Sequence, residues 1–383
     1  MIRRPVVLLG FLWVFTPALL QAAVAQQEVM TGVERVVAVG DIHGDCGQFE
    51  ALLRSAGLID EGGKWSGGKT HLVQTGDVLD RGPDSRRALD LLMRLEEEAQ
   101  AAGGAVHALI GNHEAMNLYG DLRYVSDGEF AAFRDAGSEK AREDLYKAHQ
   151  KEVQASLPAG QVAKFEDGYR SRWEADHPLG YAEHRRAFGR EGTYGKWIRR
   201  HSAVIRIDGA LFLHGGLSPK YADWSIRKIN EAIREELGDF EKLAKGITMD
   251  EEGPLWYRGL AQGDEKALAP HVATLLKGNG VERIVIGHTF TEGAVIPRFA
   301  GKVLQIDVGL ARLYDPKLRM ACLLIEKGKA SALHRGKRLE LPSDPDRDLL
   351  RYLREAAALD PQPSPLGRRI AELEARMAVP SEK

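Results

Sequence analysis

The side chains best suited to chemistry in this sequence stand in five short motifs that contain glycine. The motifs are GDIHGD at 40–45, GDVLDRG at 76–82, GNHE at 111–114, HGG at 214–216 and GHT at 287–289. Their metal-type side chains are Asp41, His43, Asp77, Asn112, His113, His214 and His288. A mixture of oxygen and nitrogen donors suits manganese, iron or zinc better than calcium. The motifs therefore predict a site for divalent metal ions.

The five motifs are informative together rather than singly. A lone Asp-x-His, or a histidine beside glycine, is more often an ordinary turn residue. GNHE, however, is expected at a given position by chance roughly once in 100,000, and here it follows two acidic motifs. We therefore interpret the set as one functional site.

Each early motif follows a short apolar run, so the elements that position the motifs are predicted strands that end in functional loops. Strands are predicted at 33–39, 69–75, 105–110, 202–207, 210–213, 282–287, 303–308 and 319–326. One helix is predicted at 47–55, and another contains Ala88, Leu91, Leu92 and Leu95, which fall on one helical face. Strands that alternate with helices in this way predict an α/β protein.

In this order the motifs resemble those of the calcineurin-like metallophosphoesterases, in their phosphoprotein-phosphatase branch and nearest to the Shewanella-like phosphatases. The resemblance covers 35–310 and implies a β-sandwich flanked by helices, an α/β/β/α fold. It also implies two divalent metal ions. The first would be held by Asp41, His43 and Asp77. Asp77 would also bind the second, together with Asn112, His214 and His288.

The residues beside the ligands suit the hydrolysis of phosphate esters. By the same resemblance, Arg81 in DRG and Arg258 in LWYRG would bind the phosphate, as would Asn112. His113 directly follows a ligand, so we expect it near the metals as a general acid for the leaving oxygen. Asp80 would orient His113. The alternatives are a turn cap for Asp80 and a surface position for Arg258.

These residues predict a hydrolase that cleaves phosphate monoesters by in-line attack of a hydroxide held between the two metals. Phosphorylated protein side chains are the favoured substrates. A nucleotide or dinucleoside polyphosphate hydrolase is the enzymatic alternative, because related sites cleave anhydrides. A non-catalytic binding protein is disfavoured, because it has no need of a general acid such as His113.

Two positions depart from the pattern of relatives. Phe290 stands where many members of the wider superfamily carry a second histidine, so the first metal has fewer protein ligands. The segment IDVGLARLY at 306–314 replaces the toxin-contacting cysteine loop of eukaryotic members, which argues against sensitivity to those toxins.

Residues 1–25 are typical of a cleaved signal peptide, with two early arginines, an apolar run and a small-residue end before Gln26. An uncleaved anchor is the alternative, but the apolar run at 5–20 is short of the roughly 20 residues that span a bilayer. We therefore expect an exported protein, periplasmic or secreted, with no stable membrane insertion after cleavage.

The remaining chain divides into a catalytic domain at 26–337, with a helical insertion at about 116–200, and a charged, proline-containing tail at 338–383. In the tail, which we expect to be peripheral, helices are predicted at 346–358 and 366–377. The aromatic residues of the insertion are Tyr119, Tyr124, Trp173, Tyr181, Tyr194 and Trp197. We expect them to form a small core of the insertion, and the alternative is that they grip an aryl phosphate.

Charge and cysteine content constrain the partners only weakly. The formal net charge of −2 gives no electrostatic reason to expect nucleic acid or an anionic membrane as a partner. Cys46 and Cys322 could form one disulfide, but two separate buried thiols are favoured. His71 and His107 lie within apolar runs and are predicted to be core or edge histidines rather than ligands.

Overall fold

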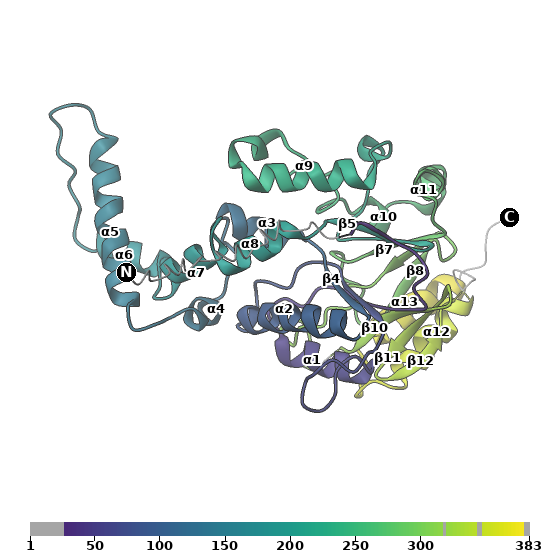
Figure 1. The fold of residues 1–383 in the computed structure, drawn as a ribbon. Coiled ribbons are helices and arrows are strands. Elements are labelled where there is room, and N and C mark those ends of the chain that lie inside the picture. The colour runs from purple at the N-terminus through teal and green to yellow at the C-terminus, as the bar shows by residue number, and fades with distance from the viewer. Residues whose placement is uncertain (1–26, 317–318, 343–346, 379–383) are drawn as a thin grey trace, which may run out of the picture.

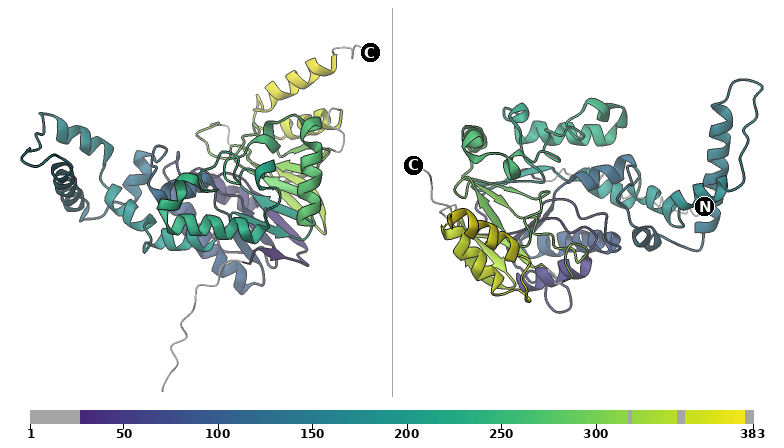
Figure 2. Two further views of the ribbon diagram at one scale, coloured as in Figure 1. Left: turned by 90° about the horizontal axis from the view of Figure 1, so that it is seen from above. Right: turned by 180° about the vertical axis from the view of Figure 1, so that it is seen from behind.

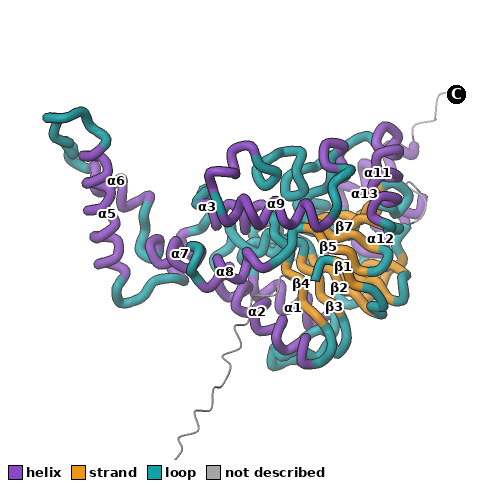
Figure 3. Tube along the Cα trace, turned by 45° about the horizontal axis from the view of Figure 1, so that its top comes forward, coloured by secondary structure: helices purple, strands orange, loops and turns teal. Residues whose placement is uncertain are grey.

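The fold is built on two six-stranded sheets packed face to face, with helices on the outer sides (Figures 1 and 3). The computed structural model describes residues 27–316, 319–342 and 347–378. In spatial order, the first sheet contains β1 (Val29–Met30), β5 (Val204–Ile207), β6 (Ala210–Leu213), β7 (Arg283–Ile286), β9 (Val303–Gln305) and β8 (Ile296–Arg298). The second contains β12 (Lys337–Glu340), β11 (Lys329–His334), β10 (Ala321–Glu326), β2 (Arg35–Val39), β3 (His71–Gln74) and β4 (Ala105–Ala108). The predicted α/β/β/α fold is confirmed.

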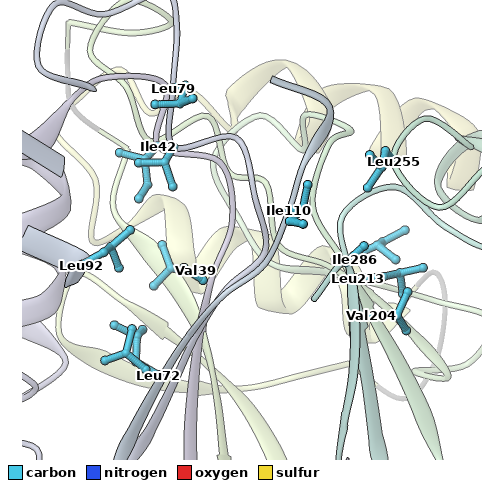
Figure 4. Close-up of a cluster of buried hydrophobic side chains, with 14 of the residues drawn as sticks. Val39, Ile42, Leu72, Leu79, Leu92, Ile110, Val204, Leu213, Leu255 and Ile286 are labelled. Atoms are coloured by element: carbon cyan, nitrogen blue, oxygen red, sulfur yellow. The ribbon is translucent and has the colours of Figure 1, made fainter. Parts of the chain in front are cut away.

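Alternating side chains along each strand supply the two faces of each sheet. In β2, Val36 and Ala38 join the core between the sheets, whereas Val37 and Val39 pack toward the helices. Figure 4 shows Val39 and Leu72 near Leu92 of a covering helix. Both faces of the central strands are therefore buried, which explains their continuous apolar sequence.

The helices cover the outer faces of the sandwich. On the second sheet they are α1 (Cys46–Ser55) and α2 (Ser85–Ala101), and beside the first sheet they are α9 (Ile226–Gly238) and α11 (Glu265–Asn279). The short helices η1 (Pro219–Tyr221), η2 (Phe240–Lys245) and α10 (Gly259–Gln262) lie between β6 and α11 in sequence. The predicted helix at 47–55 and the one containing Leu91 are present as α1 and α2.

Parallel pairing brings the ends of the motif-bearing strands together. Strands β2, β3 and β4 run parallel to one another, and β6, β7 and β9 do so in the other sheet. The carboxyl ends of parallel strands meet at one edge of a sheet, so the loops that follow them can build one site.

The chain between β4 and β5, which includes the predicted insertion at about 116–200, is helical. It contains α3 (Asn112–Tyr119), α4 (Asp127–Ala132), α5 (Ser138–Ala155), α6 (Tyr169–Asp176), α7 (Tyr181–Phe188) and α8 (Thr193–Arg200). Helices α5 and α6 extend away from the sandwich as an arm, in Figure 1 and in both views of Figure 2.

The aromatic residues of this insertion do not form a single core. Trp173 packs against Tyr146 with ring centroids 5.0 Å apart, so the arm has a small core of its own. The Tyr194 hydroxyl and the Trp197 indole instead donate to carboxylates of α2, each at 2.7 Å. Tyr124 is 43% exposed. Tyr194 also packs on Phe133 and Phe188 of the insertion, with ring centroids 5.9 and 5.5 Å apart, as expected of an insertion core. The expectation of one shared core is wrong for Tyr124, which faces a cavity.

The tail contains the two predicted helices, α12 (Arg347–Ala357) and α13 (Gly367–Ala378). Tyr352 and Leu353 of α12 are buried with apolar residues of both sheets. Helix α12 is therefore not peripheral, because its apolar stripe covers part of the sandwich.

Other expectations from the sequence have mixed outcomes. Cys46 and Cys322 are separate buried thiols. The predicted signal peptide at 1–25 lies outside the described residues. Within those residues, no helix has the length and apolar character needed to cross a membrane.

Candidate metal centre

All six predicted ligands are buried together at the carboxyl ends of β2, β3, β4, β6 and β7. The ligand with the greatest exposure is His288, at 7%. They line, or lie directly behind, a cavity of about 430 Å³ that opens at the same edge of the sandwich. The sequence order of the motifs is thus converted into spatial proximity by the parallel strands.

Asp77 stands at the centre of the group. Its Oδ2 lies 3.3 Å from Nε2 of His214 and 3.9 Å from Nε2 of His43, which come from opposite sheets. Its Oδ1 accepts the backbone N–H of His113 at 3.0 Å. One carboxylate therefore faces both halves of the site.

His43 and Asp41 form one half. The Nδ1 of His43 lies 3.1 Å from the carbonyl oxygen of Leu79, and its Nε2 lies 3.7 Å from Oδ2 of Asp41. The other oxygen of Asp41 accepts the backbone N–H of His288 at 3.0 Å. If Nδ1 of His43 donates to Leu79, the Nε2 lone pair is available to a metal.

His214, His288 and Asn112 form the other half. The Nε2 of His214 lies 2.9 Å from Oδ1 of Asn112 and 3.0 Å from Nδ1 of His288. The Nδ1 of His214 lies 2.9 Å from the carbonyl oxygen of Thr75, which orients the ring. The Nε2 of His288 is buried without a hydrogen-bond partner among the described residues.

The backbone at these loops is strained. Five residues that are not glycine adopt positive φ values, namely His43 (46°), Asp77 (58°), Asp80 (69°), Arg81 (68°) and His288 (61°). Such left-handed conformations cost energy in residues with a Cβ, and they concentrate at functional sites. The fold holds these side chains in place against a local conformational preference.

Two glycines are required by close approach. A Cβ on Gly111 would lie 2.4 Å from Oδ1 of Asp77, and one on Gly287 would lie 2.7 Å from Oδ1 of Asp41. Any larger residue at position 111 or 287 would therefore collide with the carboxylate of Asp77 or Asp41.

His113 and Asp80 form a buried pair beside the ligands. The Nδ1 of His113 lies 2.5 Å from Oδ2 of Asp80, whose other oxygen accepts from Nδ2 of Asn117 at 2.8 Å. This contact leaves Nε2 of His113 on the cavity side, 3.7 Å from Asp77. Asp80 thus contacts His113 rather than only capping a turn.

Arg81 and Arg258 both line the cavity. Nη1 of Arg258 donates to the carbonyl oxygen of His288 at 2.8 Å and to Oγ1 of Thr289 at 3.1 Å. The guanidinium of Arg81 lies 5.4 Å from the ring centre of Tyr124 and 5.7 Å from that of Tyr314. Arg258 is therefore an exposed residue that lies at the cavity.

An aromatic rim of Tyr124, Phe290 and Tyr314 borders the cavity. The rings of Phe290 and Tyr314 stack with centroids 5.7 Å apart, and Tyr124 lies 5.1 Å from the ring of His113. Tyr124 belongs to this rim and not to a core of the insertion, and no sequence motif marks Tyr314.

Two acidic residues of the site were missed by the sequence analysis. Glu114 accepts the backbone N–H groups of Gly111, Asp77 and Val78, each at 2.8 Å. Asp307 lines the cavity and accepts the N–H of Gly309 at 3.0 Å. Asp307 follows an apolar run in IDVG, a pattern like that of Asp41, and this signal could have identified it.

Burial and crowding of like charges perturb the titration of the site. Burial, with Asp307 and Asp77 nearby, raises the pKa of Asp41 well above its usual value. Burial also raises the pKa of Asp307 to about 6 and lowers that of His43 to about 3. For Asp77, burial is outweighed by His214 and His113, which hold its pKa well below the usual value. Without a cation, the buried carboxylates of Asp41, Asp77 and Asp307 therefore repel one another.

The donor set fits divalent metals. Ligand atoms of His43, Asp77 and His113 lie within 4.8 Å of one another, and so do those of Asp77, His214 and His288. Both groups contain Asp77, so this carboxylate could contribute to either ion. The first group contains His113 in place of the predicted ligand Asp41, whose Oδ2 lies 3.7 Å from Nε2 of His43. Bound cations would relieve the crowding of the buried carboxylates Asp41, Asp77 and Asp307.

His71 and His107 lie away from this edge. Nδ1 of His71 and Nε2 of His107 are 3.0 Å apart, between neighbouring strands β3 and β4. These histidines do not line the cavity, which agrees with the interpretation of core or edge residues.

The sequence profile described as calcineurin-like phosphoesterase matches residues 34–291. Shewanella-like protein phosphatase 2 of Arabidopsis thaliana is 31% identical over 301 residues, which cover 73% of this chain and 72% of the relative. Shewanella-like protein phosphatase 1 of Plasmodium berghei is 26% identical over 321 residues, which cover 77% and 76%. Among solved structures, the cold-active protein-tyrosine phosphatase of a psychrophilic Shewanella species is similar, with a TM-score of 0.63, 27% identity and 84% coverage of each chain.

Proposed function

The chain belongs to the calcineurin-like phosphoesterase family and is a hydrolase of the phosphatase type, and on this premise we propose that it removes phosphate from phosphorylated protein side chains. The observation that carries the proposal is the position of Asp77, whose carboxylate lies near His43 on one side and near His214 and His288 on the other. The His113–Asp80 pair and the two cavity arginines lie at the same site. A protein that only binds a ligand has no use for this combination.

We propose that Asp41, His43 and Asp77 hold one metal, and that Asp77, Asn112, His214 and His288 hold the other. When bound, two divalent cations supply a nucleophile from water at neutral pH and positive charge for the phosphoryl oxygens. Manganese, iron and zinc all suit the donors.

The chain's own groups bind and orient the phosphoryl group. Arg258 is anchored on the carbonyl oxygen of His288, so its planar guanidinium is held against the ligands. Arg81 has no carboxylate partner in the described part of the chain and presents its donors to the same cavity. Planar cationic forks match the oxygens of a phosphate.

His113 is placed to protonate the leaving oxygen. Burial disfavours its charged form, but Asp77 and Asp80 outweigh that effect and raise the pKa of His113. Because Asp80 contacts Nδ1, the proton to be donated is on Nε2, which faces the cavity. Asp80 acts through His113 and is a positioning residue.

The aromatic rim favours aryl phosphates, such as phosphotyrosine, among phosphorylated side chains. Tyr124 and Phe290 are 43% and 41% exposed beside the cavity, so their rings can contact a substrate ring. The solved Shewanella relative is named as a protein-tyrosine phosphatase, which supports the same direction.

The test is a substrate panel on metal-analysed protein. We expect phosphotyrosine peptides and nitrophenyl phosphate to be hydrolysed with higher kcat/KM than diadenosine tetraphosphate or ATP. Preference for the anhydrides would replace this proposal with a polyphosphate hydrolase. Binding of phosphopeptides without turnover, in protein that contains two metals, would indicate a binding protein.

We also propose that the protein is exported, on the pattern of residues 1–25. The intact mass of protein recovered outside the cytoplasm should correspond to a chain that begins at about Gln26. A mass that includes Met1 would indicate an uncleaved anchor.

A further inference from the structure

A second cavity, of about 600 Å³, lies beside the catalytic cavity and shares part of its wall. Gln262, Thr289 and Phe290 line both cavities. The shared residues include Phe290 of the aromatic rim, so a substrate with its phosphoryl group at the metal ligands can extend over this ring into the second cavity.

Positive charge dominates the wall of the second cavity. Among the residues that the structure describes, Arg298 of β8 and Arg369 and Arg376 of α13 line it, together with the carboxylate of Glu265. Arg298 and Glu265 pair with each other, with Nε and Oε1 3.0 Å apart. Of the arginines that line this cavity, Arg369 and Arg376 are outside this pair.

The pair of Arg298 and Glu265 is structural. Nη1 and Nη2 of Arg298 donate to the carbonyl oxygens of Leu260 and Gly263, and the second oxygen of Glu265 accepts the N–H of Phe299 at 2.7 Å. Both side chains are thus used within the protein, so they are poor choices for ligand contacts.

Arg369 has a different environment. It is half-buried and makes no hydrogen bond or ion pair within the described residues. Burial lowers the pKa of Arg369, Glu372 opposes that effect, and Arg298 and Arg376 add to it. A half-buried guanidinium without a partner is costly, and a bound anion would relieve that cost.

Helix α13 is attached to the loop that carries catalytic residues. Arg368 forms an ion pair with Glu292, which lies in the loop that begins with His288 and also contains Phe290. The neighbouring Arg369 is therefore held close to the catalytic edge rather than on a free helix.

We propose that the second cavity is an anion subsite that binds an acidic group of the substrate in addition to the phosphoryl group. The inference rests on the proposed phosphatase function. In a phosphopeptide the group is an aspartate or glutamate near the phosphorylated residue. A free oxyanion has the same chemistry, and the experiment distinguishes the two sources. Guanidinium groups bind such oxyanions through paired hydrogen bonds.

The test compares phosphotyrosine peptides that differ only in aspartate or alanine near the phosphotyrosine, on either side. The measured quantity is the ratio of kcat/KM for the acidic peptide to that for the neutral peptide. We expect the native protein to prefer one acidic peptide by about tenfold, as for a hydrogen bond to a charged group. Arg369→Gln should remove most of this preference, and Arg369→Glu should reverse it toward a lysine-containing peptide.

Arg351→Gln is the matched control, because it removes the same charge from an exposed position on α12 outside the cavity. It should keep the preference. Nitrophenyl phosphate, which has no second acidic group, shows that each variant is folded and active. Arg376→Gln serves if Arg369 variants fail to fold, and it should lower the same ratio.

The inference is overturned if the native protein shows no acidic preference, or if Arg351→Gln reduces it as much as Arg369→Gln. It is also overturned if sulfate binding depends on Arg369 while acidic peptides gain nothing, because the anion source would then be a small ion. If neither nitrophenyl phosphate nor any phosphopeptide is hydrolysed, the proposed function itself fails.

Discussion

At the scale of the residue, Asp77 carries most of the proposed chemistry because both donor groups contain it. We predict that Asp77→Asn removes nearly all activity and lowers metal content at both positions. An asparagine keeps the size of the side chain and one acceptor oxygen but loses the bridging charge. Activity and metal per chain are measured on the same sample, with the partly exposed Asp84→Asn as the control. Retention of two tightly bound metals would refute the bridge.

His113 can be tested through the leaving group. An alkoxide needs a proton more than a nitrophenolate does, so a general acid matters more for alkyl phosphates. We predict that His113→Asn slows alkyl phosphates by a factor within the typical range of about 10² to 10⁴, and slows nitrophenyl phosphate much less. Asp80→Asn should give the same pattern more weakly, because it disturbs only orientation. Equal losses on both esters, with metals retained, would mean that His113 is not the acid.

The residues predicted from the motifs are brought together in the structure because each motif combines a ligand-type side chain with a strand end. Glu114 was overlooked because it acts on backbone N–H groups, for which no side-chain partner exists in the sequence. The short distance between His214 and Asp77 could not be predicted from the sequence, because it depends on how the two sheets pack against each other.

At the scale of the element, most interior strands and the edge strand β4 were predicted, whereas the edge strands β1, β8 and β12 and the interior strand β11 were not. Strands such as β2 and β7 are buried on both faces, so their sequences are apolar throughout. Strand β8 contains Pro297 and lies at a sheet edge, where its missing N–H costs no ladder bond. Strand β12 has one buried apolar residue, Leu339, and it too is an edge strand.

The connection between α12 and α13 is held by a buried carboxylate that gives a testable pH dependence. Asp360 lies 2.9 Å from His334 of β11 and 2.9 Å from Nε of Arg335, and it accepts from Ser364 at 2.7 Å. Burial alone would raise the pKa of Asp360, but these hydrogen bonds outweigh burial and lower it from 3.8.

A lowered pKa in the folded state means that Asp360 stabilises the fold above the unfolded pKa, and that this contribution is lost as pH falls through the folded pKa. We predict that Asp360→Asn lowers Tm at pH 7, and that the difference from the native protein shrinks below about pH 4. Thermal unfolding at a series of pH values measures this. A Tm difference that stays constant down to acid pH would contradict the assignment.

At the scale of the whole molecule, the tail is part of the folded body. Leu353 of α12 is fully buried with residues of both sheets. We predict that Leu353→Ala lowers the free energy of unfolding by about 2 to 5 kcal/mol. Leu313→Ala, at a position 60% exposed, should change it by less than about 0.5 kcal/mol. Chemical denaturation measures both free energies of unfolding. If Leu353→Ala changes the free energy as little as Leu313→Ala does, α12 is a peripheral helix.

The backbone N–H of His288 donates to Asp41 across 247 positions of the chain. Asp41 is the first proposed ligand in the sequence and His288 is the last. A chain that is only partly synthesised or translocated therefore lacks a complete metal site. If the protein is exported as proposed, and crosses the membrane unfolded, maturation of the centre would follow release of nearly the whole chain. The ions installed would then be drawn from the pool of the compartment in which folding finishes, and the abundance of metals there would decide which form of the enzyme accumulates.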